Sequence, residues 1–294
     1  MTMLTRNGAS SYYLGADGPT GPEYVLVKEF ADYLGIELEI MAATAFNQLA
    51  GLLEQRRGDL IAANLARTPA REEQFNFGPV YQETATVVVY RRGQPKPRSL
   101  PDLAGRKIMV IAGSSYEEAL LEAAKEVPGL EWESRSDVGM EALLLAVADG
   151  AIDATLLDSN IYRLNGHFYP RVAVGFTLPG ALPLSWAFRP GPDDSLLSEA
   201  YTFMKQTVES GRLQEIQNAF YLPESRLDRV GMFQFLRQVR ERLPALLPLF
   251  QDIAAMHDMD WRLLAAIGYQ ESHWDPDASS YTGVRGVMML TRRT

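Results

Sequence analysis

Residues 269–279, YQESHWDPDAS, bring a glutamate, a histidine, a tryptophan and two aspartates into one short run. Leu264, Ile267 and Glu271 are spaced by three and four residues, which places them on one face of a helix. That face is otherwise apolar, so we expect Glu271 at the C-terminal end of a buried stripe. Burial and the negative end of the helix would favour the protonated carboxyl group that a general acid needs.

The same stretch also fits a purely structural interpretation. Glu271 could be an exposed helix-end residue, and Trp274 could simply pack in a core. Asp275 and Asp277 could supply the second carboxylate that glycosidases usually need, but an aspartate directly before a proline, as at Asp275, is typical of a turn. Spacing alone favours the structural interpretation of Glu271.

Polar groups that could hold a small zwitterion follow three predicted strands. They are Arg67 and Arg71 after LIAAN, Ser114 and Ser115 after IMVIAG, and Asp158 after ATLL. In parallel α/β sheets, ligands bind beyond the carboxyl ends of the strands. Arginine and the free N–H groups of a helix N-terminus would bind a carboxylate, and the aspartate would bind an ammonium. Each residue alone is better explained as a surface charge or a helix cap, and only their joint placement favours a ligand cleft.

The elements that must position these groups alternate between strand and helix patterns up to about residue 221. A helical stripe at 22–34 is followed by a strand-like segment at 36–41, and the alternation continues to the strand at 151–158. This order predicts an α/β fold with mainly parallel strands. Breaks at 87–105 and 178–194, both rich in proline and glycine, indicate two lobes joined by two crossing strands.

These breaks define the expected domains. Lobe 1 comprises residues 1–90 and 183–221, and lobe 2 comprises residues 91–182. We expect a linker at 222–231. From 232 the pattern is helical only, so residues 232–294 are expected to form the N-terminal part of an all-α domain, with Asp260 capping its last helix.

Composition limits the classes of function. The formal net charge of −9 argues against a nucleic-acid partner, which would require a basic face. The absence of cysteine excludes disulfides, thiolate metal sites and a cysteine nucleophile. His167, His257 and His273 are scattered, so we expect no metal site, and we expect no cofactor. No apolar run reaches the roughly 20 residues that span a bilayer.

Nearly all of residues 4–221 resembles the solute-binding proteins of family 3, the periplasmic amino-acid-binding proteins. The resemblance is carried by GPTGPEYVLVKEFADYLG, GDLIAANLARTPAREEQFNFGPVY, LAGRKIMVIAGSSYEEAL and ADGAIDATLLD. It implies a small amino-acid ligand, with Arg71 as the carboxylate clamp, Ser115 as an added carboxylate donor and Asp158 as the ammonium partner. Tyr13 and Tyr81 would be walls of the cleft.

The stretch ESHWDPDASSYTGVRGVMML resembles the first motifs of the lysozyme-like lytic transglycosylases, over roughly residues 245–294. The resemblance implies that Glu271 protonates the glycosidic oxygen between N-acetylmuramic acid and N-acetylglucosamine. The carboxylate would then take a proton from the 6-hydroxyl of the sugar, which gives a 1,6-anhydro product. Ser272 would orient Glu271 or contact the substrate. Met289 stands where many relatives have glutamine.

Together the resemblances imply a two-lobed, periplasmic-binding-protein-like α/β domain followed by an all-α lysozyme-like domain that is truncated. The chain enters a strand abruptly and ends without a closing element, so we expect a piece of a longer protein, inactive by itself. We expect the whole to cleave peptidoglycan glycan strands, regulated by an amino acid or cell-wall peptide. It would lie in the periplasm, at the outer membrane, with peripheral attachment through other segments. The alternative is an amino-acid-binding protein with a non-catalytic helical appendage.

Overall fold

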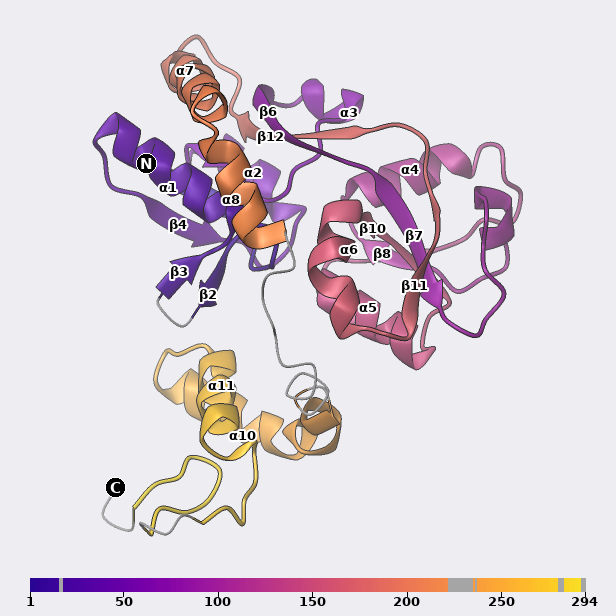
Figure 1. Ribbon diagram of the computed structural model, residues 1–294, viewed down its shortest axis with the longest axis vertical. Helices are drawn as coiled ribbons and strands as arrows, with labels where there is room; N and C mark the ends of the chain where they lie inside the picture. Colours follow the sequence, from indigo (N-terminus) through magenta and orange to yellow (C-terminus); the bar gives the residue numbers. More distant parts are fainter. Residues whose placement is uncertain (16–17, 222–234, 236, 280–282, 292–294) are drawn as a thin grey trace. The chain divides into compact units, whose positions relative to one another are not determined.

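The computed structural model describes residues 1–15, 18–221, 235, 237–279 and 283–291 (Figure 1). Contacts divide the chain into two compact units, Met1–Glu224 and Ser225–Thr294. The linker predicted at 222–231 lies outside the described residues. Each unit is described below by itself.

The first lobe of the N-terminal unit is built on a five-stranded sheet with the strand order β4-β1-β5-β12-β6. Its strands are β1 Thr2–Thr5, β4 Glu39–Ala42, β5 Leu60–Ile61, β6 Asn76–Thr84 and β12 Leu182–Phe188. β1 pairs parallel with β4 and β5, whereas β12 pairs antiparallel with β5 and β6. A separate hairpin joins β2 Tyr13–Gly15 to β3 Gly18–Thr20.

Helices cover both faces of this sheet. They are α1 Pro22–Leu34, α2 Gln48–Glu54, α3 Pro69–Glu72, α7 Ser195–Glu209 and α8 Arg212–Tyr221. Successive residues of a strand point to opposite faces, so Met3 packs in one core with Phe30 of α1 and Phe203 of α7. Leu4 packs in a second core with Leu53 of α2. Burial on both faces explains why β1 is apolar at adjacent positions.

The second lobe contains a three-stranded sheet, β10-β7-β11, and a parallel pair, β8 with β9. Its elements are β7 Thr86–Arg91, η1 Leu100–Leu103, β8 Met109–Ile111, α4 Ser115–Ala123, β9 Glu133–Arg135, α5 Met140–Asp149, β10 Ala154–Asp158, α6 Ser159–Asn165, η2 Gly166–Phe168 and β11 Val172–Thr177. Val88, Val110, Leu120, Leu144 and Leu156 form the centre of its core. Figure 1 shows the two lobes as separate bodies joined by long extended segments.

Two details of this unit differ from the prediction. β7 pairs antiparallel with β10 and β11 in the second lobe, so the first crossing lies at Ala85 and the predicted lobe boundary after residue 90 is late. β6 and β7 form one nearly continuous extended run, and no change of composition marks the crossing. The three-stranded sheet is also antiparallel rather than parallel. β7 enters the second lobe from the first lobe and runs antiparallel to both of its neighbours, β10 and β11.

In the described residues of the C-terminal unit, α10 Leu243–Met256 packs against α11 Trp261–Ser272, and turns and isolated bridges follow. Phe250, Ala265 and Trp274 form its small core. The predicted N-cap is confirmed, since the Asp260 side chain accepts a hydrogen bond from the backbone N of Arg262. Among the helices of the described residues, none has the length and apolarity required to cross a membrane.

Candidate functional site

A hollow of about 80 Å³ lies between the two lobes of the N-terminal unit and is lined by residues of both. Arg71 lines it from the first lobe, and Ser114, Ser115 and Asp158 line it from the second. Four of the seven residues predicted to bind a ligand therefore meet at one place. They meet because β5, β8 and β10 all direct the ends of their strands toward the junction of the lobes.

Arg71 is almost completely buried, and its guanidinium touches both lobes. Its Nη1 donates to the carbonyl of Ala66 at 2.9 Å, and its Nη2 donates to the carbonyl of Gly113 at 3.1 Å. Its Nε lies 3.2 Å from a carboxylate oxygen of Glu118. Burial lowers the pKa of Arg71, and the Glu118 carboxylate opposes that shift. These contacts engage three of the five N–H donors of a guanidinium, which leaves one on each Nη for a carboxylate in the hollow.

Asp158 ends β10 and is 1% exposed. Its Oδ2 accepts a hydrogen bond of 2.7 Å from Asn64 Nδ2, and its backbone N donates to the Tyr116 hydroxyl at 3.2 Å. Its buried Oδ1 has no donor in hydrogen-bonding geometry among the described residues, although the Tyr116 hydroxyl lies close enough to the carboxyl group to oppose the rise of its pKa. Burial raises the pKa of Asp158 to about 7. A buried acceptor without a donor is costly, and an ammonium group in the hollow would supply the missing donor.

Ser114 and Ser115 lie at the N-terminus of α4. Ser114 is the N-cap: its hydroxyl donates to the Ile111 carbonyl at 2.6 Å and accepts from the backbone N of Glu117 at 3.4 Å. The Glu117 carboxylate accepts in turn from the backbone N of Gly113 at 2.6 Å. Ser114 therefore has the structural role of a helix cap, and Ser115, the first residue of the helix, is the better candidate for a ligand contact.

Three of the residues predicted for the cleft do not line this hollow. Arg67 forms an ion pair with Glu72, and its guanidinium is held outside the hollow. Tyr81 is buried, and its hydroxyl donates to Glu23 beneath the sheet edge. Tyr13 lies in the β2–β3 hairpin, which does not contribute to the lining. In each case a local partner or a separate element directs the side chain elsewhere.

The sequence did not point to Asn64, which lines the hollow, or to Glu23, which Asn64 contacts. Asn64 adopts a left-handed conformation with φ of 53°, which asparagine tolerates better than most residues. Its backbone N donates to Glu23 at 2.5 Å, and its side-chain oxygen accepts from Asn160 at 2.8 Å. With its bond to Asp158, Asn64 ties the first lobe to the second. Burial raises the pKa of Glu23 to about 7. The detectable signal was the position of Asn64 at the end of LIAAN.

In the C-terminal unit, Glu271 is exposed at the end of α11. The expected buried stripe through Leu264 and Ile267 is wrong, since Ile267 is 40% exposed and the buried residues of α11 are Ala265 and Gly268. Gly268 allows close approach: a Cβ there would lie 3.1–3.3 Å from side-chain atoms of the facing segments. The helix therefore turns Ala265 and Gly268 toward the core, with Leu264 partly buried beside them, whereas Ile267 and Glu271 are exposed.

Ser272 joins the last turn of α11 to a later segment of the chain. Its hydroxyl donates to the carbonyls of Val287 at 2.8 Å and Gly268 at 3.2 Å, and it accepts from the backbone N of Asp275 at 3.1 Å. These are backbone contacts, so Ser272 fixes the position of the helix end. Glu271 is the residue that directly precedes this fixed point.

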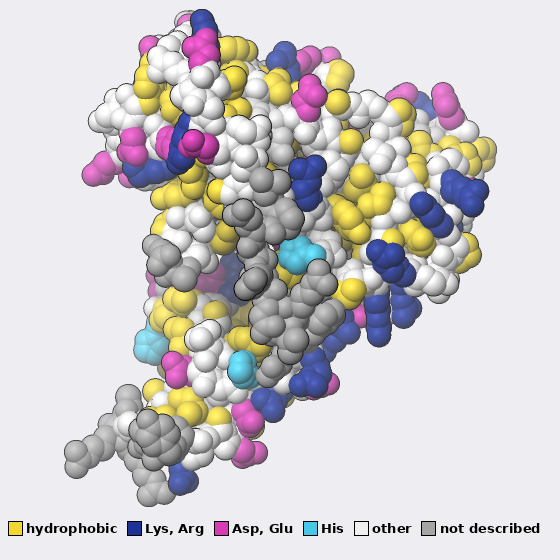
Figure 2. Space-filling model, in the orientation of Figure 1, with side chains coloured by type: hydrophobic (Ala, Val, Ile, Leu, Met, Phe, Trp, Pro, Cys, Tyr) yellow, Lys and Arg dark blue, Asp and Glu magenta, His cyan; other side chains and the backbone are white. Residues whose placement is uncertain are grey.

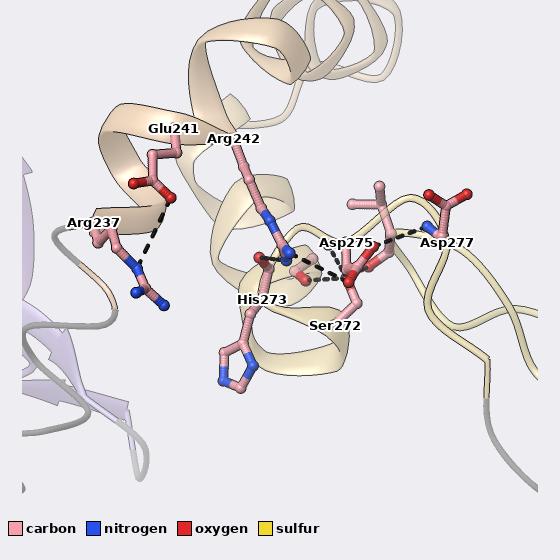
Figure 3. A network of polar contacts seen from close by, with 9 residues as sticks. Arg237, Glu241, Arg242, Ser272, His273, Asp275 and Asp277 are labelled. Atoms are coloured by element: carbon pink, nitrogen blue, oxygen red, sulfur yellow. Dashed lines mark hydrogen bonds and ion pairs between the residues drawn. The ribbon is translucent and has the colours of Figure 1, made fainter.

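A polar network holds the turn after α11 (Figure 3). Arg242 donates to the carbonyl of His273 at 3.1 Å and lies 3.3 Å from the carboxylate of Asp275. Asp275 also accepts from the backbone N of Asp277 at 3.0 Å. Asp275 is thereby committed to the turn, as its place before a proline suggests. Trp274 is 2% exposed, so the turn is anchored in the core.

In the part of the chain that the structure describes, no group of three or more histidine, aspartate or glutamate residues could hold a metal ion. The exposed carboxyl group of Glu271 is able to donate or accept a proton. The chemistry open to the hollow is recognition of a small ligand with both charges.

Comparison with known proteins finds one family model that matches the N-terminal unit and another that matches part of the C-terminal unit. Residues 2–223 match the family model described as bacterial extracellular solute-binding proteins, family 3. The chain belongs to this family. Residues 248–294 of this family 3 member match a second model, the transglycosylase SLT domain.

Curated relatives match the chain over nearly all of its length. The chain is 42% identical to the membrane-bound lytic murein transglycosylase F of Pseudomonas savastanoi pv. phaseolicola, over 100% of the chain and 60% of the relative. It is also 42% identical to the protein of that name from Aeromonas salmonicida, over 98% of the chain and 57% of the relative. The chain thus spans about 60% of the length of the curated relatives it matches.

Solved structures confirm the two-lobed fold. An ancestral arginine-binding protein bound to arginine matches with a TM-score of 0.67 at 22% identity, covering 75% of this chain and 97% of that one. A putative L-cystine ABC transporter from Listeria monocytogenes matches with a TM-score of 0.67 at 19% identity, covering 76% of this chain and 96% of that one. At these identities the matches establish the fold of the N-terminal unit.

Proposed function

We propose that the protein is a peptidoglycan lytic transglycosylase whose N-terminal unit binds a small zwitterionic ligand. The observation that carries the proposal is the joining, in one chain, of a family 3 unit and a transglycosylase segment that contains Glu271. Relatives matched over the whole chain bear the name lytic murein transglycosylase, which supports the proposed reaction.

In the proposed reaction, Glu271 donates its proton to the glycosidic oxygen between N-acetylmuramic acid and N-acetylglucosamine. The acetamido group of the substrate assists the departure of the leaving sugar. The Glu271 carboxylate then removes the proton of the 6-hydroxyl, whose oxygen closes on the anomeric carbon. The product is a 1,6-anhydro sugar, and no water is consumed.

Two features of the C-terminal unit support this role. The hydrogen bonds of Ser272 to Gly268 and Val287 fix the helix end that carries Glu271. Glu271 is exposed, so a glycan strand has access to its carboxyl group. Water around that group would be displaced by the bound glycan, which strengthens the electrostatic interactions of the acid with its substrate.

The test is digestion of purified peptidoglycan by the full-length protein that contains this chain, followed by mass spectrometry of the products. We expect 1,6-anhydro-muropeptides from the unmodified protein and none from Glu271→Gln. Asp252→Asn is the control, because Asp252 is an exposed carboxylate on α10 of the same unit. Products with hydrated reducing ends would show ordinary hydrolysis and refute the proposed reaction.

For the N-terminal unit, we propose that the hollow binds an amino acid or a short cell-wall peptide. The carboxylate of the ligand would bind the free Nη hydrogens of Arg71, and its ammonium would bind the unpaired Oδ1 of Asp158. Isothermal titration calorimetry with amino acids and muropeptides tests this proposal. Absence of heat with every ligand, or heat unchanged by both Arg71→Ala and Asp158→Ala, would refute it.

A second candidate function is amino-acid binding alone, in delivery to a transporter. The hollow favours it, since it requires nothing from the C-terminal unit. Ligand binding together with a complete lack of peptidoglycan cleavage by the full-length protein that contains this chain would establish this alternative and exclude the first.

We also propose that the ligand regulates cleavage, because one chain carries both the hollow and the catalytic segment. A ligand that binds one arrangement of the lobes more tightly shifts the population toward that arrangement. Initial rates of peptidoglycan digestion with and without saturating ligand test the link. Equal rates in the two conditions would contradict it.

For its location we propose the periplasm, with attachment at the outer membrane. The name of the family contains the word extracellular, and the names of the relatives contain the word membrane-bound. Both support this proposal. Fractionation of cell envelopes followed by immunoblotting tests it, and recovery of the protein in the cytoplasmic fraction would contradict it.

A further inference from the structure

One stretch of the second lobe concentrates positive charge that neither the proposed reaction nor the hollow uses. Residues 91–107, RRGQPKPRSLPDLAGRK, contain six Lys and Arg residues and a single acidic residue, Asp102. The formal net charge of the whole chain is −9, so this excess is local. On the face shown in Figure 2, Lys and Arg side chains gather over the second lobe. The stretch is therefore a candidate for contact with a negatively charged partner.

The pairing of the strands brings both ends of this stretch to one end of the second-lobe sheet. Ala154, the first residue of β10, pairs with Tyr90 of β7 and forms a bridge with Ile108. Arg91 follows Tyr90, and Lys107 precedes Ile108. These two cations therefore lie on either side of the start of β10.

Arg171 joins the group from the next strand. The backbone N of Arg92 donates to the carbonyl of Arg171 at 2.6 Å, directly before β11. β10 runs from this end to Asp158, which lines the hollow, so the cations lie at the end of the sheet opposite to the hollow. We call them the cationic edge, and its members are Arg91, Arg92, Lys96, Arg98, Arg106, Lys107 and Arg171.

Arg106 fixes the loop that follows β7. Its Nη2 donates to the carbonyl of Pro95 at 2.9 Å, and its Nε donates to the carbonyl of Asp102 at 2.8 Å. Lys96 and Arg98, which lie within this loop, are exposed. Their charges are thus presented from a backbone that is held in place.

The carboxylates beside the edge accept hydrogen bonds from the backbone. Asp102 Oδ2 accepts from the backbone N of Arg98 at 2.7 Å and of Ser99 at 3.2 Å, and the first of these bonds is the main cause that lowers the pKa of Asp102. Asp153 Oδ2 accepts from the backbone N of Lys107 at 2.8 Å. These carboxylates therefore serve to hold the chain at the edge.

Much of the positive charge is left without a close partner. Among the described residues of the N-terminal unit, five exposed members of the edge take part in no ion pair: Arg92, Lys96, Arg98, Lys107 and Arg171. Three acidic residues lie beside the seven basic ones, namely Asp102, Asp153 and Asp149, which directly precedes the Gly150 that faces Arg91. The edge thus has a charge of +4 (7 − 3).

The form of the edge fits an extended layer of negative charge better than a single small anion. Its members are spread along one end of a sheet, and none of them lines the hollow between the lobes. A bilayer with anionic lipids presents a dense and fluid layer of phosphates, which can move to meet several separated cations at once. Clusters of about four to eight Lys and Arg residues are typical of proteins that bind such a surface.

We propose that the cationic edge docks the protein on a bilayer surface that contains anionic phospholipids. The inference rests on the proposed attachment at the outer membrane, and it adds the contacting surface and the class of lipid. The attraction acts between exposed charges, which salt screens over a Debye length of about 8 Å at physiological ionic strength. The contact is therefore reversible and weakens as salt is added.

The experiment is cosedimentation of the whole chain with lipid vesicles. One set contains phosphatidylethanolamine and phosphatidylglycerol, and the other contains phosphatidylethanolamine and phosphatidylcholine. We expect at least about tenfold tighter binding to the anionic set, with the difference lost at high salt. The combined variant Arg92→Gln, Lys96→Gln and Arg98→Gln should bind the anionic set at least about tenfold more weakly than the unmodified chain.

Two controls separate the edge from total charge and from folding. The combined variant Arg56→Gln, Arg57→Gln and Lys205→Gln removes the same number of charges from exposed positions of the first lobe, and it should bind like the unmodified chain. Arg92→Lys with Arg98→Lys keeps the charge of the edge and should also keep the binding. Circular dichroism shows whether each variant is folded. Lys107→Gln with Arg171→Gln, at the flanks of the edge, gives an independent test and should also weaken binding.

Three results would overturn the proposal. They are equal binding to the two sets of vesicles, unchanged binding by both glutamine variants of the edge, and loss of cosedimentation with purified peptidoglycan while vesicle binding stays intact. The last result would assign the edge to the cell wall instead. Fractionation of cells that express the full-length protein separates the two proposals. Retention of the glutamine variants in the membrane fraction would refute the edge but leave the proposed location standing, whereas recovery of the unmodified protein in the cytoplasmic fraction would refute both.

Discussion

Replacing Asp158 by asparagine should stabilise the ligand-free protein at alkaline pH while abolishing ligand binding. The carboxyl group is buried, its Oδ1 has no partner among the described residues, and burial raises its pKa to about 7. Asparagine has the same shape and can still accept the hydrogen bond from Asn64 through its side-chain oxygen. It does not ionise, so the cost of a buried charge is absent at every pH.

The sign and size follow from the pKa difference between the two states. In the unfolded chain the pKa of Asp158 has its ordinary value of about 3.8, and in the folded chain burial raises it to about 7. Between these values the folded state binds more protons, so stability is fully present below pH 3.8 and is lost as pH rises through 7. A pKa difference of about 3 between the two states lowers the free energy of unfolding by an amount on the order of 4 kcal/mol.

Urea unfolding at pH values from 5 to 8.5, with the unmodified protein and Asp158→Asn, measures this effect. The advantage of the variant should grow with pH and level off above the folded pKa. Burial also raises the pKa of Glu23 to about 7. Glu23 is present in both proteins, so its contribution to the pH dependence cancels when the two are compared. Asp252→Asn, at an exposed position of α10, is the control and should show no such trend. A stability difference between unmodified protein and Asp158→Asn that is independent of pH would refute the reasoning.

Three further predictions concern the hollow and the C-terminal core. Arg71→Ala should weaken amino-acid binding at least about tenfold, because it removes charge-assisted hydrogen bonds to the ligand carboxylate; unchanged affinity in calorimetry would contradict this. Asn64→Gly should relieve the left-handed backbone but weaken ligand binding, because Asp158 loses its side-chain donor; equal affinity would show that Asp158 positions itself. Trp274→Ala should destabilise the C-terminal unit by about 3–5 kcal/mol through loss of a buried indole, and an unaltered unfolding midpoint would disagree.

Several features of the protein could be predicted from its sequence because they depend on local pattern and on general rules of topology. The alternation of strand and helix periodicity predicted the two-lobed α/β fold, which the solved relatives confirm. The rule that ligands bind at strand ends brought Arg71, Ser115 and Asp158 into one group, and the structure places all three around one hollow. The cap at Asp260 was visible from residue type alone.

Other features were decided only when the elements packed. Periodicity shows which residues share a face of a helix, but not which face meets a partner. In α11 the core contacts are made by Ala265 and Gly268, with Leu264 partly buried beside them, and Ile267 and Glu271 are exposed. Arg67 pairs with Glu72, and Arg71 and Asp158 line one hollow although 87 positions separate them in sequence (158 − 71). Such contacts depend on distances between elements, which no local pattern of residues contains.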